Sequence, residues 1–124
     1  MTRWLVDGMN VIGSRPTGWW RDRPGAMRSL SDELGGLARS TGDEVTVVFD
    51  GAPFEIESKA GVEVAFARRR GRDAADDDIV ALVEADDDPG SLTVVTSDGA
   101  LGERVTRAGA HVLGVGQFRR RLDS

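Results

Sequence analysis

The sequence predicts an α/β fold in which a mostly parallel sheet of four to five strands is covered by helices on both faces. Short apolar runs bounded by turn residues alternate with segments whose apolar residues recur at helical spacing. This alternation is typical of βαβ units, in which each helix crosses one face of a parallel sheet. With 124 residues and neither repeats nor a linker, the chain is expected to form a single domain over residues 1–124.

The N-terminal part of the chain predicts one strand, one loop and one long helix. Residues 4–6 are the apolar run Trp-Leu-Val, which ends at Asp7. The region that follows, up to Gly25, is rich in Gly, Pro, Trp and Arg and predicts a loop. Helical spacing with Gly42 just beyond as a stop signal predicts the helix. Its apolar residues are Met27, Leu30, Leu34, Leu37 and Ala38.

The rest of the chain continues the same alternation. Continuous or alternating apolar residues predict strands, because a strand in such a sheet is covered on one or both faces. Apolar residues three to four positions apart predict the helices between them. The predicted strands are 45–49, 62–66, 92–96 and 111–115, and the predicted helices are 75–84, 99–107 and a terminal helix containing Phe118 and Leu122.

Composition limits the chemistry that the chain can perform. Hydrophobic residues make up 40% and charged residues 30%, as in ordinary globular proteins. The absence of cysteine removes disulfides, thiolate catalysis and zinc sites with cysteine ligands. A single histidine, His111, leaves no pair of histidines for catalysis or metal binding. Carboxylates must therefore carry any acid, base or metal chemistry.

The sequence also predicts a cytoplasmic protein that does not enter a membrane. No apolar run approaches the roughly 20 residues that a membrane-spanning helix needs. The N-terminus lacks the basic stretch and long apolar segment of a signal peptide. The absence of cysteine agrees with the reducing cytoplasm.

Arginines form two clusters although the formal net charge is −5. A negative net charge argues against a surface that is basic throughout and binds nucleic acid generally, but it does not describe local basic patches. The planar guanidinium of arginine can bind two phosphate oxygens at once. A run of charged residues usually lies on a solvent-exposed edge of a protein. The position of the first cluster, just before Asp76, nevertheless favours RNA binding. The clusters are Arg68, Arg69, Arg70 and Arg72, and Arg119, Arg120 and Arg121.

Aspartates occur near the ends of the predicted strands, where a parallel sheet usually binds its ligands. The carboxyl ends of the strands face one crevice, so these carboxylates should converge there. Neighbouring carboxylates raise one another's pKa unless a cation lies between them, and hard oxygen ligands suit Mg²⁺ or Mn²⁺. The pattern therefore predicts a metal site for phosphoryl chemistry. The four candidate ligands are Asp7, Asp50, Asp76 and Asp98.

Each aspartate alone also has a structural explanation. Asp7 and Asp50 are each followed by glycine, as is common in turns, and Asp98 suits the N-cap of the helix after it. Residues 86–88 are also aspartates, but the Pro-Gly that follows predicts a solvated turn at the opposite edge of the sheet. Turns and caps do not require that several carboxylates converge at one edge of the sheet. The expected convergence therefore favours the metal site.

Asp76 is the most informative of the four because it lies within a predicted helix. At about 100° per residue, Asp76 points toward the apolar face, whereas Asp77 and Asp78 point outward. A charge directed at the sheet needs a partner, and a metal ion would supply one. The residues taken to define the apolar face are Ile79, Val80, Leu82 and Val83.

Aromatic residues in the loop after the first strand predict contacts with unpaired nucleotides. Trp19 and Trp20 are flanked by Arg15, Arg21 and Arg23. Aromatic rings can stack on bases while neighbouring arginines bind phosphates. At least one of the two rings is also expected to cap the core.

Five short motifs occur in order at residues 7–13, 47–51, 75–79, 95–98 and 118–122: DGMNVIG, VVFDG, ADDDI, VTSD and FRRRL. Together they resemble the YacP-like branch of the NYN domains, in the PIN-like ribonuclease superfamily. Met9 stands where tyrosine is usual in the first motif. The set spans nearly the whole chain, so the resemblance covers a single NYN domain.

The resemblance implies a PIN-like Rossmannoid three-layer sandwich and a Mg²⁺- or Mn²⁺-dependent endoribonuclease for single-stranded RNA, such as mRNA. Asp7, Asp76, Asp98 and Asn10 match catalytic positions, and the acidic set including Asp50 matches the metal ligands. Asp77 remains an alternative to Asp76. The other interpretation is an RNA-binding or ribosome-associated module with little or no cleavage, and the oligomeric state stays open.

Overall fold

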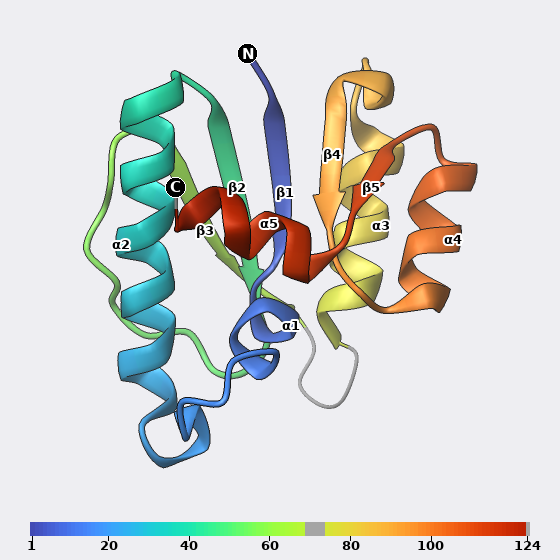
Figure 1. Cartoon of the computed structure of the whole chain (residues 1–124). Coiled ribbons are helices and arrows are strands. Elements are labelled where there is room, and N and C mark those ends of the chain that lie inside the picture. Colours follow the sequence, from blue (N-terminus) through green and yellow to red (C-terminus); the bar gives the residue numbers. More distant parts are fainter. Residues whose placement is uncertain (69–73, 124) are drawn as a thin grey trace.

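A computed structural model describes residues 1–68 and 74–123 of the chain. In these ranges five parallel strands form one sheet in the order β3-β2-β1-β4-β5, between two helical layers (Figure 1). The predicted α/β architecture is therefore confirmed. The strands are β1 (Arg3–Asp7), β2 (Glu44–Phe49), β3 (Val62–Phe66), β4 (Leu92–Val95) and β5 (His111–Leu113). The helices are α1 (Gly8–Gly13), α2 (Arg23–Thr41), α3 (Ala74–Ala85), α4 (Gly99–Arg107) and α5 (Val115–Leu122), with short 3₁₀ helices η1 (Trp19–Arg21) and η2 (Pro89–Ser91).

The sheet separates two hydrophobic cores. Successive side chains of a strand point to opposite faces, so Trp4 and Val6 of β1 enter one core while Leu5 enters the other. The first core is closed by α1, α2 and α5, on the near side in Figure 1. The second is closed by α3 and α4. The central strand β1 is consequently buried on both faces and paired on both edges.

Capping residues fix both ends of α2. The Asp22 side chain accepts a hydrogen bond from the Gly25 amide at 3.1 Å, which satisfies a free donor of the first turn. Gly42 ends the helix with φ of 75°, a conformation that glycine adopts without strain. The stop signal predicted at Gly42 is thus confirmed. No helix in the described ranges combines the length and apolarity needed to cross a membrane.

The segment predicted as a loop up to Gly25 contains α1 and η1 instead, so that part of the prediction is wrong. Val11 and Ile12 of α1 are almost completely buried, and their packing stabilises a helix of only six residues. A helix this short gives no repeated spacing in the sequence. Glycine at both of its ends, Gly8 and Gly13, made a loop the more obvious prediction.

The apolar face of α3 also differs from the prediction. Leu82 is 43% exposed, whereas Ala75, Ile79, Val80 and Val83 are buried. The side of α3 that faces α4 includes Asp77, which contacts Arg104 of α4. On a helical wheel Leu82 lies on the side of α3 opposite to Asp77, and so away from α4. The burial of α3 is therefore shifted toward α4.

The acidic turn at residues 86–88 lies near the start of β1, at the predicted edge of the sheet. Asp86 is not simply solvated, because its two carboxylate oxygens accept hydrogen bonds from the Arg3 guanidinium. Ser91 accepts a further bond from Arg3. The turn thereby ties the end of α3 to the amino end of β1.

Gly8 lies where β1 passes into α1, tightly against β2. A Cβ atom there would come within 2.5 Å of Phe49 Cδ1 and 3.0 Å of Val47 Cγ2. We predict that Gly8→Ala lowers the free energy of unfolding by about 1–3 kcal/mol, the usual cost of overpacking. Urea denaturation of the wild type and the variant measures this cost.

Gly13→Ala is the matched control because a Cβ atom at Gly13 would meet no neighbour within 4 Å. It should not lower stability, since alanine favours a helix more than glycine does. Equal stabilities of the two alanine variants would contradict the proposed clash.

Candidate functional site

Three of the four predicted aspartates lie at the carboxyl ends of adjacent strands. Asp7 is the last residue of β1, Asp50 follows β2, and Asp98 caps α4 after β4. The sheet order places β1 between β2 and β4. Asp76 lies in the first turn of α3, which packs against the same strands. The candidate site thus lies at the carboxyl edge of the sheet, where open parallel sheets usually bind ligands.

Asp7 is a buried carboxylate at the centre of this group, with only 6% of its surface exposed. Its Oδ2 accepts a hydrogen bond from Thr96 Oγ1 at 3.0 Å. Burial raises the pKa of Asp7 to about 7, the Thr96 hydrogen bond opposes the rise, and the charges of the other three aspartates add to it. Asp7 therefore experiences the negative charge of the other three predicted residues.

The carboxylates of Asp50 and Asp98 belong to the candidate site and also accept hydrogen bonds from backbone amides at the start of a helix. Asp50 Oδ1 accepts from the Ala75 amide at 2.8 Å. Asp98 Oδ1 accepts from the amides of Ala100 and Leu101, which makes Asp98 the N-cap of α4. In both cases the bonds among described residues use Oδ1. Capping consequently leaves the second oxygen of each carboxylate able to bind another group.

Asn10 positions the segment that carries Asp98. Its Oδ1 accepts a hydrogen bond from the Ser97 amide at 2.8 Å, and Ser97 Oγ accepts one from the Val115 amide at 2.9 Å. Thr96 Oγ1 also accepts from the Asp98 amide at 3.1 Å. Thr96 and Ser97 were not predicted from the sequence. The only signal for them was two hydroxyl residues between a strand and an N-cap aspartate.

The neighbours of Asp76 have different surroundings. The exposed Asp77 carboxylate pairs with Arg104 of α4 at 3.1 Å. Asp78 was predicted to face outward, but its side chain is only 17% exposed and accepts from the Arg68 amide at 2.7 Å. Asp78 is on the side of α3 that meets the chain leaving β3, which the helical angle alone does not reveal. The charge of Asp76 adds to the rise in the pKa of Asp7.

The predicted RNA-binding residues belong to two segments of the chain, in which the structure describes Arg68, Trp19 and Trp20. Arg68 has an 81% exposed side chain, paired with Asp78, while Arg69, Arg70 and Arg72 lie outside the described residues. Trp19 packs against the core, which confirms that one tryptophan caps it. Trp20 is 64% exposed, with its ring edge-on to Trp19 at 6.1 Å between centroids. The Trp20 ring is therefore the one of the two that is largely exposed to solvent.

The aspartates suit a divalent cation by ligand type. Carboxylate oxygens are the ligands that Mg²⁺ and Mn²⁺ prefer, and a cation would offset the burial and repulsion that raise the pKa of Asp7. As the side chains stand, no three acidic or histidine groups among residues 1–68 and 74–123 are close enough to hold a metal ion. The donor chemistry fits, but the described side chains do not form a closed set of ligands.

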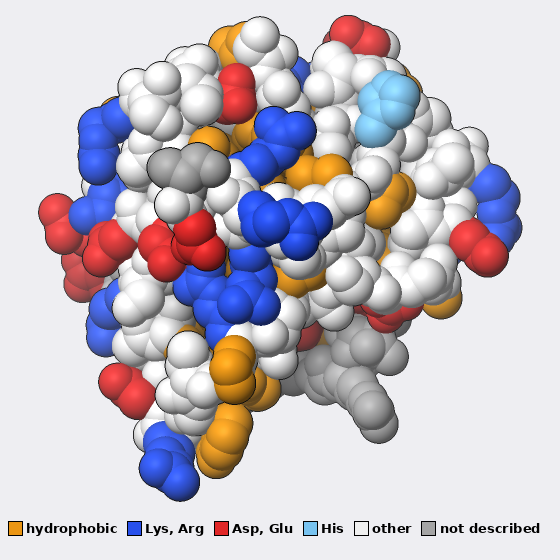
Figure 2. All heavy atoms as spheres, in the orientation of Figure 1, with side chains coloured by type: hydrophobic (Ala, Val, Ile, Leu, Met, Phe, Trp, Pro, Cys, Tyr) orange, Lys and Arg blue, Asp and Glu red, His pale blue; other side chains and the backbone are white. Residues whose placement is uncertain are grey.

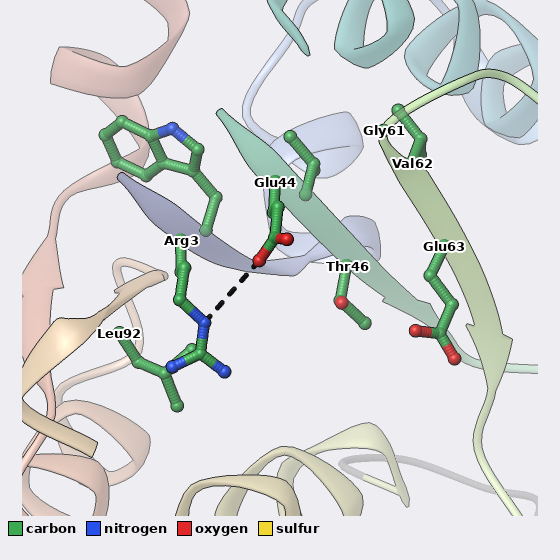
Figure 3. Close-up of a pocket in the computed structure, with 9 residues that line it drawn as sticks. Arg3, Glu44, Thr46, Gly61, Val62, Glu63 and Leu92 are labelled. Atoms are coloured by element: carbon green, nitrogen blue, oxygen red, sulfur yellow. Dashed lines mark ion pairs between the residues drawn. The ribbon is translucent and has the colours of Figure 1, made fainter. Parts of the chain in front are cut away.

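A hollow of about 440 Å³ lies at the opposite end of the strands. Figure 3 shows Arg3 and Glu44 paired across it, with Thr46 and Glu63 on the neighbouring strands. The Arg3 and Glu44 side chains approach within 3.7 Å. This hollow is at the amino ends of the strands, away from the aspartates and from the usual ligand crevice.

Comparison with known proteins agrees with the architecture. The family model of the YacP-like NYN domain matches residues 4–124. The crystal structure of Rae1 (YacP) from Bacillus subtilis is similar, with a TM-score of 0.83 and 26% sequence identity over 99% of this chain and 74% of that chain. A single-substitution mutant of Rae1 gives a TM-score of 0.82 and 26% identity, over 99% and 76% of the respective chains. No curated protein sequence matches the chain. The chain therefore belongs to the YacP-like NYN domain family and has the PIN-like fold of a nuclease-type domain.

Proposed function

We propose that this chain is a Mg²⁺- or Mn²⁺-dependent endoribonuclease that hydrolyses single-stranded RNA. The observation that carries the proposal is the position of Asp7, Asp50 and Asp98 at the carboxyl ends of adjacent strands, with Asp76 in the first turn of the helix that packs against them. The membership of the chain in a nuclease-type family supports the same chemistry. The proposal takes residues 1–124 as one domain that acts on RNA, such as mRNA, in the cytoplasm.

The four aspartates are the residues that would hold the metal. A bound divalent cation supplies an activated water and neutralises charge on the departing oxygen of a phosphodiester. Thr96 fixes one oxygen of Asp7, and Asn10 fixes the segment that leads to Asp98. Asn10 uses its oxygen for this contact, so its amide nitrogen can donate to a phosphate oxygen of the substrate.

Basic and aromatic groups on either side of the aspartates would hold the RNA. The arginines of the first cluster bind phosphates by charge and paired hydrogen bonds. The rings of Trp19 and Trp20 belong to the proposed binding surface, with the exposed Trp20 stacking on a base. Stacking requires an unpaired base, which favours single-stranded RNA over a duplex. The arginines concerned are Arg68, Arg69, Arg70 and Arg72.

An RNA-binding or ribosome-associated module without cleavage is the second candidate. It is favoured by the incomplete ligand set among the described residues and by the capping roles of Asp50 and Asp98. A module of this kind would bind RNA equally well with and without divalent metal. Cleavage of labelled single-stranded RNA in Mn²⁺, and its loss in EDTA, distinguishes the two candidates.

Asp76→Asn separates a catalytic site from a structural cluster. This substitution keeps the size of the side chain but removes a metal-binding charge, so cleavage should fall by about two orders of magnitude or more, as when transition-state charge loses its stabilisation. The fold should persist. Initial cleavage rates in Mn²⁺ and thermal melting of the same samples measure both effects.

Asp77→Asn is the control for this measurement. Asp77 makes an exposed ion pair with Arg104, and such pairs contribute little to stability. Asp78 is unsuitable as a control because it also holds the Arg68 amide. A wild-type cleavage rate for the Asp76 variant would remove Asp76 from the proposed site, and a loss confined to the Asp77 variant would assign the role to Asp77.

The raised pKa of Asp7 predicts how the stability of the metal-free protein depends on pH. Burial raises this pKa from 3.8 in the unfolded chain to about 7 in the fold. Between those values the folded state keeps a proton that the unfolded state has lost, so the contribution of Asp7 to stability falls as pH rises. It is fully present below pH 3.8 and lost above about 7.

Asp7→Asn should remove this contribution. In EDTA the variant should be more stable than the wild type at pH 8, by a few kcal/mol, because it carries no buried charge. The difference should shrink toward pH 4. Urea unfolding of both proteins across this range measures the effect, and parallel stability profiles would exclude a buried Asp7 with a raised pKa.

A further inference from the structure

Arg23, the first residue of α2, contacts the rim of the candidate site. Its Nη2 donates a hydrogen bond to the backbone oxygen of Asp50 at 3.2 Å. A Cβ atom on Gly51 would lie 3.7 Å from the same nitrogen. The side chain of Asp50 meanwhile holds the start of α3. The Arg23 guanidinium thus lies directly beside one of the four aspartates.

Arg23 makes no ion pair with a carboxylate among the described residues. A guanidinium has five N–H donors, and this one makes a single hydrogen bond, to a neutral carbonyl oxygen. Five of the other arginines are instead paired with carboxylates. The arginines in such ion pairs are Arg3, Arg15, Arg68, Arg104 and Arg107.

The exposed ring of Trp20 is close to Arg23 along the chain. Two residues lie between them, so their Cα atoms are at most about 11 Å apart. The Arg21 guanidinium lies 6.0 Å from the centroid of the Trp20 ring. Figure 2 shows exposed hydrophobic side chains at the lower end of α2, in the region of η1. The cation of Arg23, which contacts Asp50, and the exposed ring of Trp20 therefore lie near each other at the start of α2.

We propose that Arg23 and Trp20 form a subsite for one unpaired nucleotide beside the bond to be cleaved. Arg23 binds the phosphate of this nucleotide, and Trp20 stacks on its base. The proposal rests on the endoribonuclease function and adds a requirement to it: the substrate must be single-stranded on the α2 side of the aspartates. Arg23 acts here as a substrate-binding residue.

A purely structural role for Arg23 would be to attach α2 to the end of β2. The same helix contains a residue that makes this kind of attachment elsewhere. Arg28 Nη2 donates to the backbone oxygen of Glu55 at 3.3 Å, and its guanidinium lies 5.0 Å from the centroid of the Phe54 ring. These contacts attach α2 to the loop after β2 and involve none of the four aspartates. A structural role therefore predicts equal effects for Arg23→Gln and Arg28→Gln.

RNA affinity in EDTA tests the subsite without any need for catalysis. The probes are a labelled single-stranded oligonucleotide and the same strand annealed to its complement, each titrated at several salt concentrations. Arg23→Gln should weaken binding of the single strand and reduce the slope of log affinity against log salt by about 0.7, the value for one phosphate contact on a single strand. Arg28→Gln should leave both quantities unchanged.

Trp20→Ala tests the stacking half of the subsite. It should weaken binding of the single strand by about fivefold or more, the scale of one base–aromatic stack, and leave duplex binding unchanged. Because Trp20 is 64% exposed, the fold should tolerate this change. Thermal melting of each variant verifies that tolerance.

The outcomes separate the subsite from the catalytic proposal. Equal effects of Arg23→Gln and Arg28→Gln, or equal loss of single-strand and duplex binding in Trp20→Ala, would overturn the subsite even if the wild type cleaves RNA. A wild type that does not cleave but shows the expected binding changes would overturn the catalytic proposal and support the subsite. Binding of neither RNA by the wild type in EDTA would overturn the subsite, whereas the catalytic proposal is decided by cleavage in Mn²⁺.

Discussion

The burial of Asp7 at the end of the central strand is the constraint on which the rest of the site depends. β1 is paired on both edges, and Trp4, Leu5 and Val6 fill the cores on its two faces. The strand cannot slide without moving these side chains, so its last residue is held in the interior. An ionised carboxylate loses hydration there, and one hydrogen bond from Thr96 compensates for only part of that loss. The hydrophobic core thus places a destabilising charge where a cation would be favourable.

Short polar side chains transmit this constraint to the neighbouring elements. Thr96 donates to Asp7 and accepts from the Asp98 amide, which links the ends of β1 and β4 to the start of α4. Ser97 connects Asn10 of α1 with Val115 of α5. Displacing one of these groups would leave polar atoms of the others unpaired, at a free-energy cost. The positions of the aspartates are therefore a property of several helices and strands together.

The sequence predicted which strands and long helices follow one another along the chain because each carries a repeated apolar pattern. It also predicted that the aspartates lie at the strand ends, since that follows from the parallel arrangement. It failed for α1, whose six residues allow no repeat. It also misplaced Leu82 and Asp78, because a helical angle does not specify which neighbours a helix has: α4 covers one side of α3, and the chain after β3 meets another. The Thr96 and Ser97 bonds depend on tertiary contacts and had no periodic signal.

Local charge explains how an acidic chain can be suited to a polyanion. Basic side chains gather over α5 in Figure 2, but some of them have packing roles: Arg119 donates to the Ser14 carbonyl oxygen, and the Arg121 guanidinium lies 5.4 Å from the centroid of a Trp4 ring. These contacts attach α5 to the fold. Arg23 instead uses one donor on a backbone carbonyl beside the aspartates. The position and pairing of each arginine, rather than the total of −5, therefore determine where the phosphates of an RNA strand would be attracted.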